Sequence, residues 1–215
     1  SLPAEQNYLK DSYGLDGNIM VSQSEYNQVS LKSVCGWLKL QLTGAGETVK
    51  SITLRGNAGE QVAGELYINT ADATSTLASE LAESGDDGEV GGTLVRPGTI
   101  LTEVTLNCFD DSSPTEKGVA LGAESTAFYI ALPPQTFEAG ITIEITDSED
   151  FTMVQSTDKI ITIDRTYIQP MAAIQFSNPN TPTEPTPASN EIWYTATAEV
   201  EPYFDDSITF GANVI

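Results

Sequence analysis

The sequence predicts an all-β fold, and more narrowly an antiparallel β-sandwich. Apolar and polar residues alternate along most of the first 176 residues, and clusters of turn residues separate the alternating stretches. Apolar residues make up 40% of the 215-residue chain, which is too many for a disordered protein. We expect about nine or ten short strands, and a β-protein of that size divides into two packed sheets.

The stretch 126–146, TAFYIALPPQTFEAGITIEIT, predicts two strands joined by a stiff connection. Pro133 and Pro134 fix φ and cannot donate to a ladder, so the connection is not a tight hairpin. Each strand has apolar residues at every second position, as half-buried strands do. These positions are Phe128, Ile130, Leu132, Ile141, Ile143 and Ile145.

The residues before this stretch predict further strands. Residues 19–21 form a short edge strand, and 29–42 contain a strand that ends at the glycines of 44–46. Residues 49–54 and 61–68 read as a hairpin around the loop 55–59. A long surface connection with one helical turn follows at 70–92, and 100–109 form a strand with Val104, Leu106 and Cys108 on one face.

After it, residues 151–155 and 159–163 read as a second hairpin, and 164–176 close the domain. We therefore place the sandwich at 1–176. Residues 177–190, SNPNTPTEPTPASN, have the composition of a stiff Pro/Thr-rich linker. Residues 191–215 form one or two strands and cannot build a core alone, so they either dock on the sandwich or begin a truncated second domain.

Charge and composition exclude several functions. Lys and Arg number 9 against 31 Asp and Glu, a formal charge of −22, which disfavours binding to nucleic acid or to anionic membranes. Histidine is absent, which removes histidine-based nucleophilic and zinc sites. The sequence contains no run of 18 apolar residues, so it predicts no membrane-spanning segment. The first residues lack a signal peptide, as those of a mature or trimmed protein would. We expect no enzyme activity and no cofactor.

Cysteines and acidic turns give no metal site. Cys35 and Cys108 lie in predicted strands, and two buried thiols or a disulfide both remain open. Acidic pairs in predicted turns lack the alternating ligand spacing of a calcium loop, so we expect no bound metal. The pairs lie at Asp86–Asp87, Asp110–Asp111, Asp147–Asp150 and Asp205–Asp206.

Most of the sandwich resembles the fimbrillin-like proteins of Bacteroides. The stretches that carry this resemblance, between about Val34 and Phe176, are VCGWLKLQLTG, VKSITLRGNAGEQVAGELYI, GVALGAESTAFYIALPPQTFEAGITIEIT and KIITIDRTYIQPM. The resemblance implies a transthyretin-like β-sandwich, related to the immunoglobulin-like kind. It also implies an exported protein of the cell surface or outer membrane, commonly lipid-anchored, that assembles into or decorates fimbriae.

The last residues resemble a different family. NEIWYT, PY and FGAN, between Asn190 and Ile215, are similar to the cap that precedes the leucine-rich repeats of BspA-like surface proteins. That resemblance implies adhesion to host matrix or to other cells. Together the two resemblances imply a non-catalytic cell adhesion or fimbrial module. It would act as a stalk or spacer ahead of a ligand-binding repeat domain, with host proteins, glycans or other fimbrial subunits as partners.

A glycan-binding sandwich is the alternative interpretation. Exposed aromatic rings bind sugars by stacking, and Trp37, Trp193 and Tyr194 are the candidate contacts, with Tyr129 and Tyr203 behind them. Each of these rings could instead pack in the core or along a strand. A third interpretation, an enzyme that uses two carboxylates about 5 to 10 Å apart, ranks last because no pair can be placed from the sequence.

Overall fold

The structure is a computed structural model of the 215-residue chain. It describes residues 1–23, 28–84, 88–90, 93–95, 98–110 and 113–180. Residues Ser1–Pro179 form one compact unit. Within the described ranges, no helix has the length and apolar character needed to cross a membrane. Most of the predicted linker and all of the predicted second domain lie outside the described residues.

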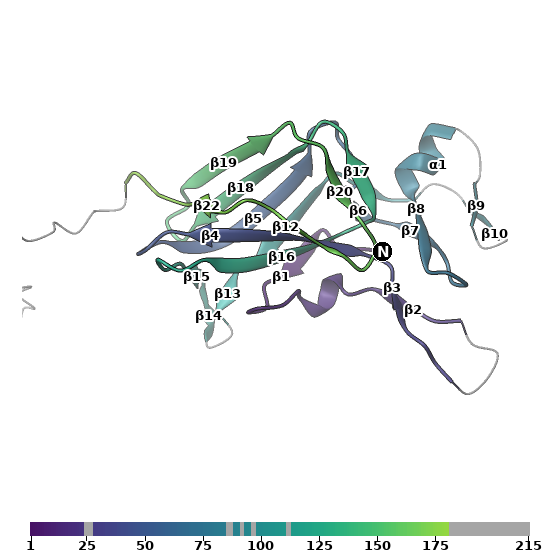
Figure 1. The fold of residues 1–215 in the computed structure, drawn as a ribbon, viewed down its shortest axis with the longest axis horizontal. Helices are drawn as coiled ribbons and strands as arrows, with labels where there is room; N and C mark the ends of the chain where they lie inside the picture. Colours follow the sequence, from purple (N-terminus) through teal and green to yellow (C-terminus); the bar gives the residue numbers. More distant parts are fainter. Residues whose placement is uncertain (24–27, 85–87, 91–92, 96–97, 111–112, 181–215) are drawn as a thin grey trace, which may run out of the picture. The chain divides into compact units, whose positions relative to one another are not determined.

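Two β-sheets pack face to face, so the predicted all-β sandwich is confirmed (Figure 1). The large sheet has the order β1-β12-β5-β18-β19, with β15 also on β5, and the small sheet has β16-β4-β21, with β22 also on β4. The large sheet contains β1 (Glu5–Asn7), β12 (Glu103–Asn107), β5 (Thr48–Gly56), β18 (Ile141–Asp147), β19 (Thr152–Thr157) and β15 (Val119–Ala120). The small sheet contains β16 (Thr126–Leu132), β4 (Gly36–Thr43), β21 (Ile168–Pro170) and β22 (Ile174–Gln175).

Short elements decorate the sandwich. They include six two-stranded pairs, one α-helix and one turn of 3-10 helix. The pairs are β2 (Met20–Val21) with β3 (Lys32–Ser33), β6 (Ala63–Gly64) with β11 (Ile100–Leu101), β7 (Leu66–Asn69) with β8 (Thr74–Leu77), β9 (Gly88–Val90) with β10 (Thr93–Val95), β13 (Phe109–Asp110) with β14 (Ser113–Lys117), and β17 (Gln135–Phe137) with β20 (Ile161–Ile163). The helices are α1 (Ala78–Ser84), inside the predicted surface connection, and η1 (Leu15–Gly17).

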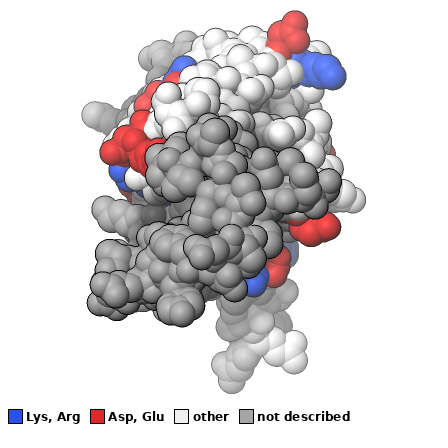
Figure 2. Space-filling view, turned by 90° about the vertical axis from the view of Figure 1, so that its left-hand side faces the viewer, with Lys and Arg blue, Asp and Glu red and all other residues white. Residues whose placement is uncertain are grey.

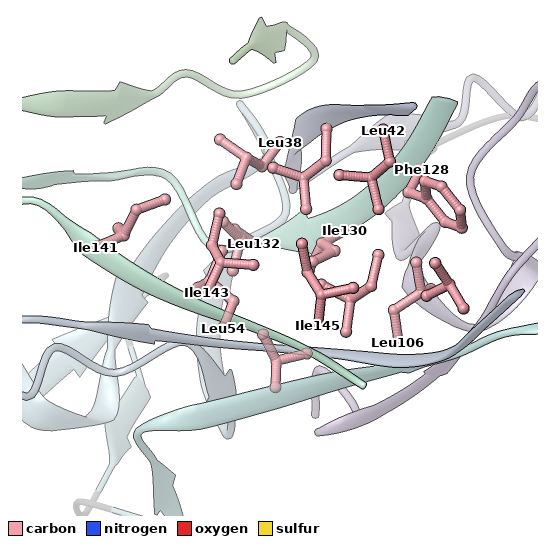
Figure 3. Packing of buried hydrophobic residues seen from close by; sticks show 14 of the residues in the cluster. Leu38, Leu42, Leu54, Leu106, Phe128, Ile130, Leu132, Ile141, Ile143 and Ile145 are labelled. Atoms are coloured by element: carbon pink, nitrogen blue, oxygen red, sulfur yellow. The ribbon is translucent and has the colours of Figure 1, made fainter. Parts of the chain in front are cut away.

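The core lies between the two sheets, and the alternation in the sequence correctly identifies its members (Figure 3). β4 contributes Leu38, Leu40 and Leu42. Every second residue of the neighbouring strand β16 lies beside them on the same face of the small sheet. β5, β12 and β18 supply the opposite wall. The side chains that alternate inward on β16 and β18, namely Phe128, Ile130, Leu132, Ile141, Ile143 and Ile145, are at most 3% exposed.

The stretch 126–146 connects the two sheets. β16 pairs with β4 in the small sheet, whereas β18 pairs with β5 and β19 in the large sheet. The prediction that Pro133 and Pro134 prevent a tight hairpin agrees with this arrangement. The connection also contains β17, a short strand that the sequence did not reveal.

Both predicted hairpins are wrong. β5 pairs with β12, β15 and β18, not with the residues that follow it, and β6 and β7 each have another partner. β19 pairs back onto β18, and β20 crosses to β17. The reason is that the loops after β5 and after β19 both take the chain out of the large sheet, to strands that pair elsewhere. Alternation specifies which residues face the core but not which strand lies alongside.

Three parallel pairings modify the predicted antiparallel architecture, and all involve the first or last strands of the sandwich. β1 is parallel to β12, and β21 and β22 are parallel to β4. The tight turn after β4 reverses the chain into β5, and β12 is antiparallel to β5, so β1 runs in the same sense as β4. The chain therefore enters where β4 begins and leaves where β4 ends, and Figure 1 shows the N-terminus and β22 at opposite ends.

Candidate functional site

Trp37, the first predicted ligand contact, is buried. It lies on the outward side of β4, yet its side chain is only 5% exposed. The ring stacks on Tyr13 with centroids 4.3 Å apart and an interplanar angle of 18°. It belongs to a second apolar cluster with Leu2, Val34, Cys35, Ala73 and Ala131. A sugar could stack on Trp37 only if Tyr13 moved away.

Residues Tyr13, Ile19 and Val21 of the N-terminal segment pack against this second cluster, and so do Leu66 and Ile68 of β7. The indole N–H of Trp37 has no hydrogen-bond partner among the described residues. Trp193 and Tyr194, the other two predicted contacts, lie outside the described residues. Only Trp37 of these three predicted contacts can therefore be placed, and the glycan-binding alternative stays a prediction.

The two cysteines are free and buried, each in a different apolar cluster. Burial raises the pKa of the Cys35 thiol from 9.0 to about 12, and burial also raises the pKa of Cys108. Thiols held in the neutral form are poor nucleophiles and poor metal ligands. Of the two alternatives left open by the sequence, the structure contains the pair of buried thiols.

Asp147, one of the acidic residues of the predicted turns, is buried at 2% exposure. Its Oδ1 accepts the backbone N–H groups of Glu149 and Phe151 at 2.8 and 2.9 Å, which closes the turn after β18. Its Oδ2 accepts a hydrogen bond of 2.7 Å from Nδ2 of Asn178. The carboxylate thus joins the last residues of the sandwich to the end of the large sheet.

Glu47 completes this arrangement from the turn between β4 and β5. It is 8% exposed, and its Oε1 accepts the backbone N–H of Asn178 at 3.0 Å. We call Glu47, Asp147 and Asn178 the terminal clamp. Asn178, which the sequence assigned to the linker, is 3% exposed and belongs to the sandwich. Asp is favoured in turns, but no sequence pattern indicates that Asp147 and Glu47 meet at one asparagine.

A second buried side chain that sequence reasoning missed is Gln6 on β1, at 3% exposure. Its Nε2 donates to the carbonyl of Ala131 and its Oε1 accepts the N–H of Ala131, both at 2.9 Å. The amide therefore imitates one residue of a β-ladder and links the first strand of the large sheet to β16 of the small sheet. A polar residue in an aperiodic lead-in segment carries no signal for this role.

The outer face of the large sheet is polar, and its side chains bond to one another across the strands. Arg55 on β5 lies between Glu144 on β18, at 2.5 Å, and Glu103 on β12, at 3.8 Å. Hydroxyl pairs at 2.9 Å continue the pattern at Thr53–Thr105, Thr142–Ser156 and Thr146–Thr152. Among the coloured residues of Figure 2, acidic and basic side chains also lie in small groups next to each other.

Within the described part of the chain, no group of three or more Cys, Asp or Glu side chains is arranged to hold a metal ion. One shallow hollow of about 230 Å³ lies beside the N-terminal segment, where Nδ2 of Asn7 donates to Asp16 at 2.7 Å. Its remaining lining residues are Tyr8, Leu9, Gly14 and Leu15. The described residues form a framework of structural polar contacts around an apolar core.

The edges of the large sheet differ in their protection. β1 has three residues, and Gln6 ties it to the small sheet. β19, TMVQST, has six residues, no charge and no proline, and it pairs with β18 alone among the described strands. Val154 on this strand is 55% exposed. Because charge, proline or a bulge commonly protects an edge, β19 is the edge that is open to another strand.

Comparisons with known proteins show a distant structural likeness. No family model matches the chain, and no curated protein matches it by sequence. The chain is similar to a crystal structure of a Bacteroides ovatus protein with a proposed role in cell adhesion, with 15% sequence identity and a TM-score of 0.39. The match covers 77% of this chain and 57% of that chain, so the chain spans a little over half the length of that protein.

Proposed function

We propose that this chain is a non-catalytic module of an exported cell-surface adhesion or fimbrial protein, and that it acts as a spacer or stalk. The observation that carries the proposal is the direction of the terminal strands. β1 runs in the same sense as β21 and β22, so the chain enters at one end of the sandwich and leaves at the other. A domain built in this way adds its own length between whatever precedes it and whatever follows it.

The length and rigidity of the sandwich suit this role. β4 has eight residues, and at about 3.3 Å per residue it extends roughly 26 Å along the axis from entry to exit. The core between the sheets is closely packed, with most of its large side chains at 0 or 1% exposure. A packed core resists bending, so the domain would keep its two ends apart.

The polar groups also support a non-catalytic role. Asp147 and Glu47, the buried carboxylates, are occupied by structural hydrogen bonds to Asn178. Arg55 engages Glu144 and Glu103 on the open face of the large sheet. Histidine, the most common general acid–base residue, is absent from the chain, and the two buried carboxylates among the described residues are engaged in these structural bonds.

The finer parts of the proposal rest on the sequence resemblances. A fimbrillin-like module would be lipid-anchored in the full-length protein and located at the cell surface or outer membrane. A BspA-like repeat domain after residue 215 would bind host matrix, cell-surface proteins or glycans. Other fimbrial subunits are further candidate partners, and the uncharged edge of β19 is the surface on which a strand from such a subunit would pair.

Surface display tests the spacer role. A bacterial outer-membrane anchor would carry a small binding domain either directly or after the 215-residue chain, and capture of ligand-coated beads would be measured. We expect the chain to increase capture on cells with surface polysaccharide and to have no effect on cells without it. A flexible Gly/Ser linker of about 22 residues is the control, because its root-mean-square span of about 26 Å matches the sandwich while its ends are not held at a fixed distance. Equal capture with and without the chain on encapsulated cells would refute the spacer role.

A further inference from the structure

The last segment of the sandwich is attached to β4 at both ends of that strand. Three backbone bonds outside the ladders fix it: Trp37 N to Tyr167 O at 2.9 Å, Met171 N to Lys39 O at 2.9 Å, and Phe176 N to Thr43 O at 2.8 Å. Between them, β21 and β22 pair in parallel with β4. We call residues 167–178 the C-terminal strap.

Tension on the chain beyond the strap would act along the axis of the strap. β21, β22 and β4 run in the same sense, so the strap would have to slide along β4, and its hydrogen bonds would be stretched together. If a strand is peeled from one end, its bonds break one after another, each at a small net cost. Sliding requires several bonds to break in one step.

Two anchors hold the far end of the strap. The ring of Phe176 is 1% exposed inside the main core and lies 6.2 Å from the ring of Phe151. Two residues further, the terminal clamp holds the backbone N–H and the side chain of Asn178 on Glu47 and Asp147. Glu47 immediately precedes β5 and Asp147 ends β18, so Asn178 is fastened to the large sheet, whereas the strap before it pairs with β4 of the small sheet.

The N-terminal end has the same geometry. β1 is parallel to β12. Tension on the first residue would act along the axis of β1, so β1 would have to slide along β12. Leu2 exchanges two backbone bonds with Gly64, at 2.7 and 2.8 Å, and its side chain is 1% exposed. The Gln6 amide adds its two bonds to Ala131. All three parallel pairings among the described strands therefore lie where tension between the two ends would enter the fold.

We propose that the sandwich is a tension-resistant module, in which the C-terminal strap and its terminal clamp hold the fold together when its two ends are pulled apart. The inference rests on the proposed spacer role, because a spacer between a cell and an attached ligand carries the force of attachment. The clamp adds its resistance at the last residues of the sandwich, where tension from that end of the chain enters the fold.

Single-molecule force spectroscopy on the 215-residue chain tests this inference by comparing two pulling axes. The first axis joins handles at the two chain ends. The second joins the N-terminus to a handle on Asp158→Cys, an exposed site that follows β19 at the same end of the sandwich as the N-terminus. Cys35 and Cys108 are both 0% exposed, so the introduced thiol can be labelled selectively. Only the first axis transmits force through the strap.

We expect the rupture force along the first axis to be about twofold higher, because several bonds must break together. Asn178→Ala should raise the unfolding rate at constant force about tenfold along the first axis and leave the second unchanged. Gln175→Ala, an exposed change on β22, is the matched control and should alter neither axis.

Equal rupture forces on the two axes of the unaltered chain would overturn the proposal, whether or not the variants fold. An equal effect of Asn178→Ala on both axes would also overturn it, since a residue that only stabilises the fold acts on both. Bead capture in the display assay does not depend on rupture force. The spacer role and the tension-resistant clamp can therefore fail separately.

Discussion

Replacing Gly140 by alanine is expected to destabilise the sandwich at the turn that leads into β18. Gly140 has a φ of +78°, its N–H donates to the carbonyl of Phe137 at 3.2 Å, and its carbonyl accepts the N–H of Asn57 at 3.0 Å. A Cβ at this position would lie 1.9 Å from the carbonyl oxygen of Thr157 and 2.7 Å from its carbon. That oxygen also accepts a hydrogen bond of 2.9 Å from Nδ2 of Asn57, so the turn and the end of β19 would have to separate.

Gly59 provides a matched control for the backbone conformation. Its φ is +77°, and a Cβ added there would have no other atom within 4 Å. Both alanine substitutions therefore carry the cost of a left-handed backbone, about 1–2 kcal/mol, and Gly140→Ala alone adds the steric conflict. Forcing atoms into a packed site typically costs about 1–3 kcal/mol. We expect the free energy of unfolding to fall by about 1–2 kcal/mol for Gly59→Ala and by about 2–5 kcal/mol for Gly140→Ala.

Urea denaturation followed by circular dichroism measures both free energies, and equal m-values would show that the two unfolding transitions are comparable. In thermal melts, 1 kcal/mol shifts the Tm of a domain of this size by about 2–4 °C, so Gly140→Ala should melt about 2–12 °C below Gly59→Ala. If both variants lose the same stability, the close approach between the turn and β19 is not a feature of the folded protein.

Gln6→Ala would leave the buried N–H and C=O of Ala131 unpaired, and we expect the free energy of unfolding to fall by about 2–4 kcal/mol in urea titrations. Exposed Gln155→Ala should change it by less than about 0.5 kcal/mol, and a similar loss in both would contradict the bridging role. For Cys35 and Cys108, burial raises the pKa in the folded state above the ordinary 9.0. As pH rises, the thiols of the unfolded chain therefore lose their protons first. The free energy of unfolding should decrease as pH rises from about 9 towards 12. Replacing both cysteines by alanine should make the free energy of unfolding less dependent on pH in this range. If a thiol reagent labelled the native protein at pH 8 as fast as the urea-unfolded protein, the thiols would not be buried.

Several parts of the fold could be predicted because they depend on local pattern. Alternation on β4, β16 and β18 identifies the core-facing residues, since side chains of a strand point to opposite faces in turn. Pro133 and Pro134 identify a connection that is not a hairpin, since proline fixes the backbone and lacks an N–H. Both features act within a few residues and need no knowledge of what lies alongside.

Strand partners could not be predicted in the same way. Strands that follow each other closely in sequence were expected to pair, but β5 pairs with β12, β15 and β18, which come later in the chain. The hairpin expected at 151–163 is replaced by two pairings, β18–β19 and β17–β20. Pairing depends on the total burial of two sheets, and similar alternating patterns are compatible with several neighbours.

The candidate site shows the same division. The sequence alone determined that Trp37 lies on the outward side of its strand, because it alternates with Leu38 and its inward neighbours. Only the tertiary structure decided that Tyr13 covers this ring and that Asn178 joins Glu47 and Asp147. Contacts between residues so far apart in the chain arise when the sheets and their terminal segments pack. The alternation in the sequence therefore determined the sandwich, and tertiary packing decided which of its surfaces are covered and where its ends are fastened.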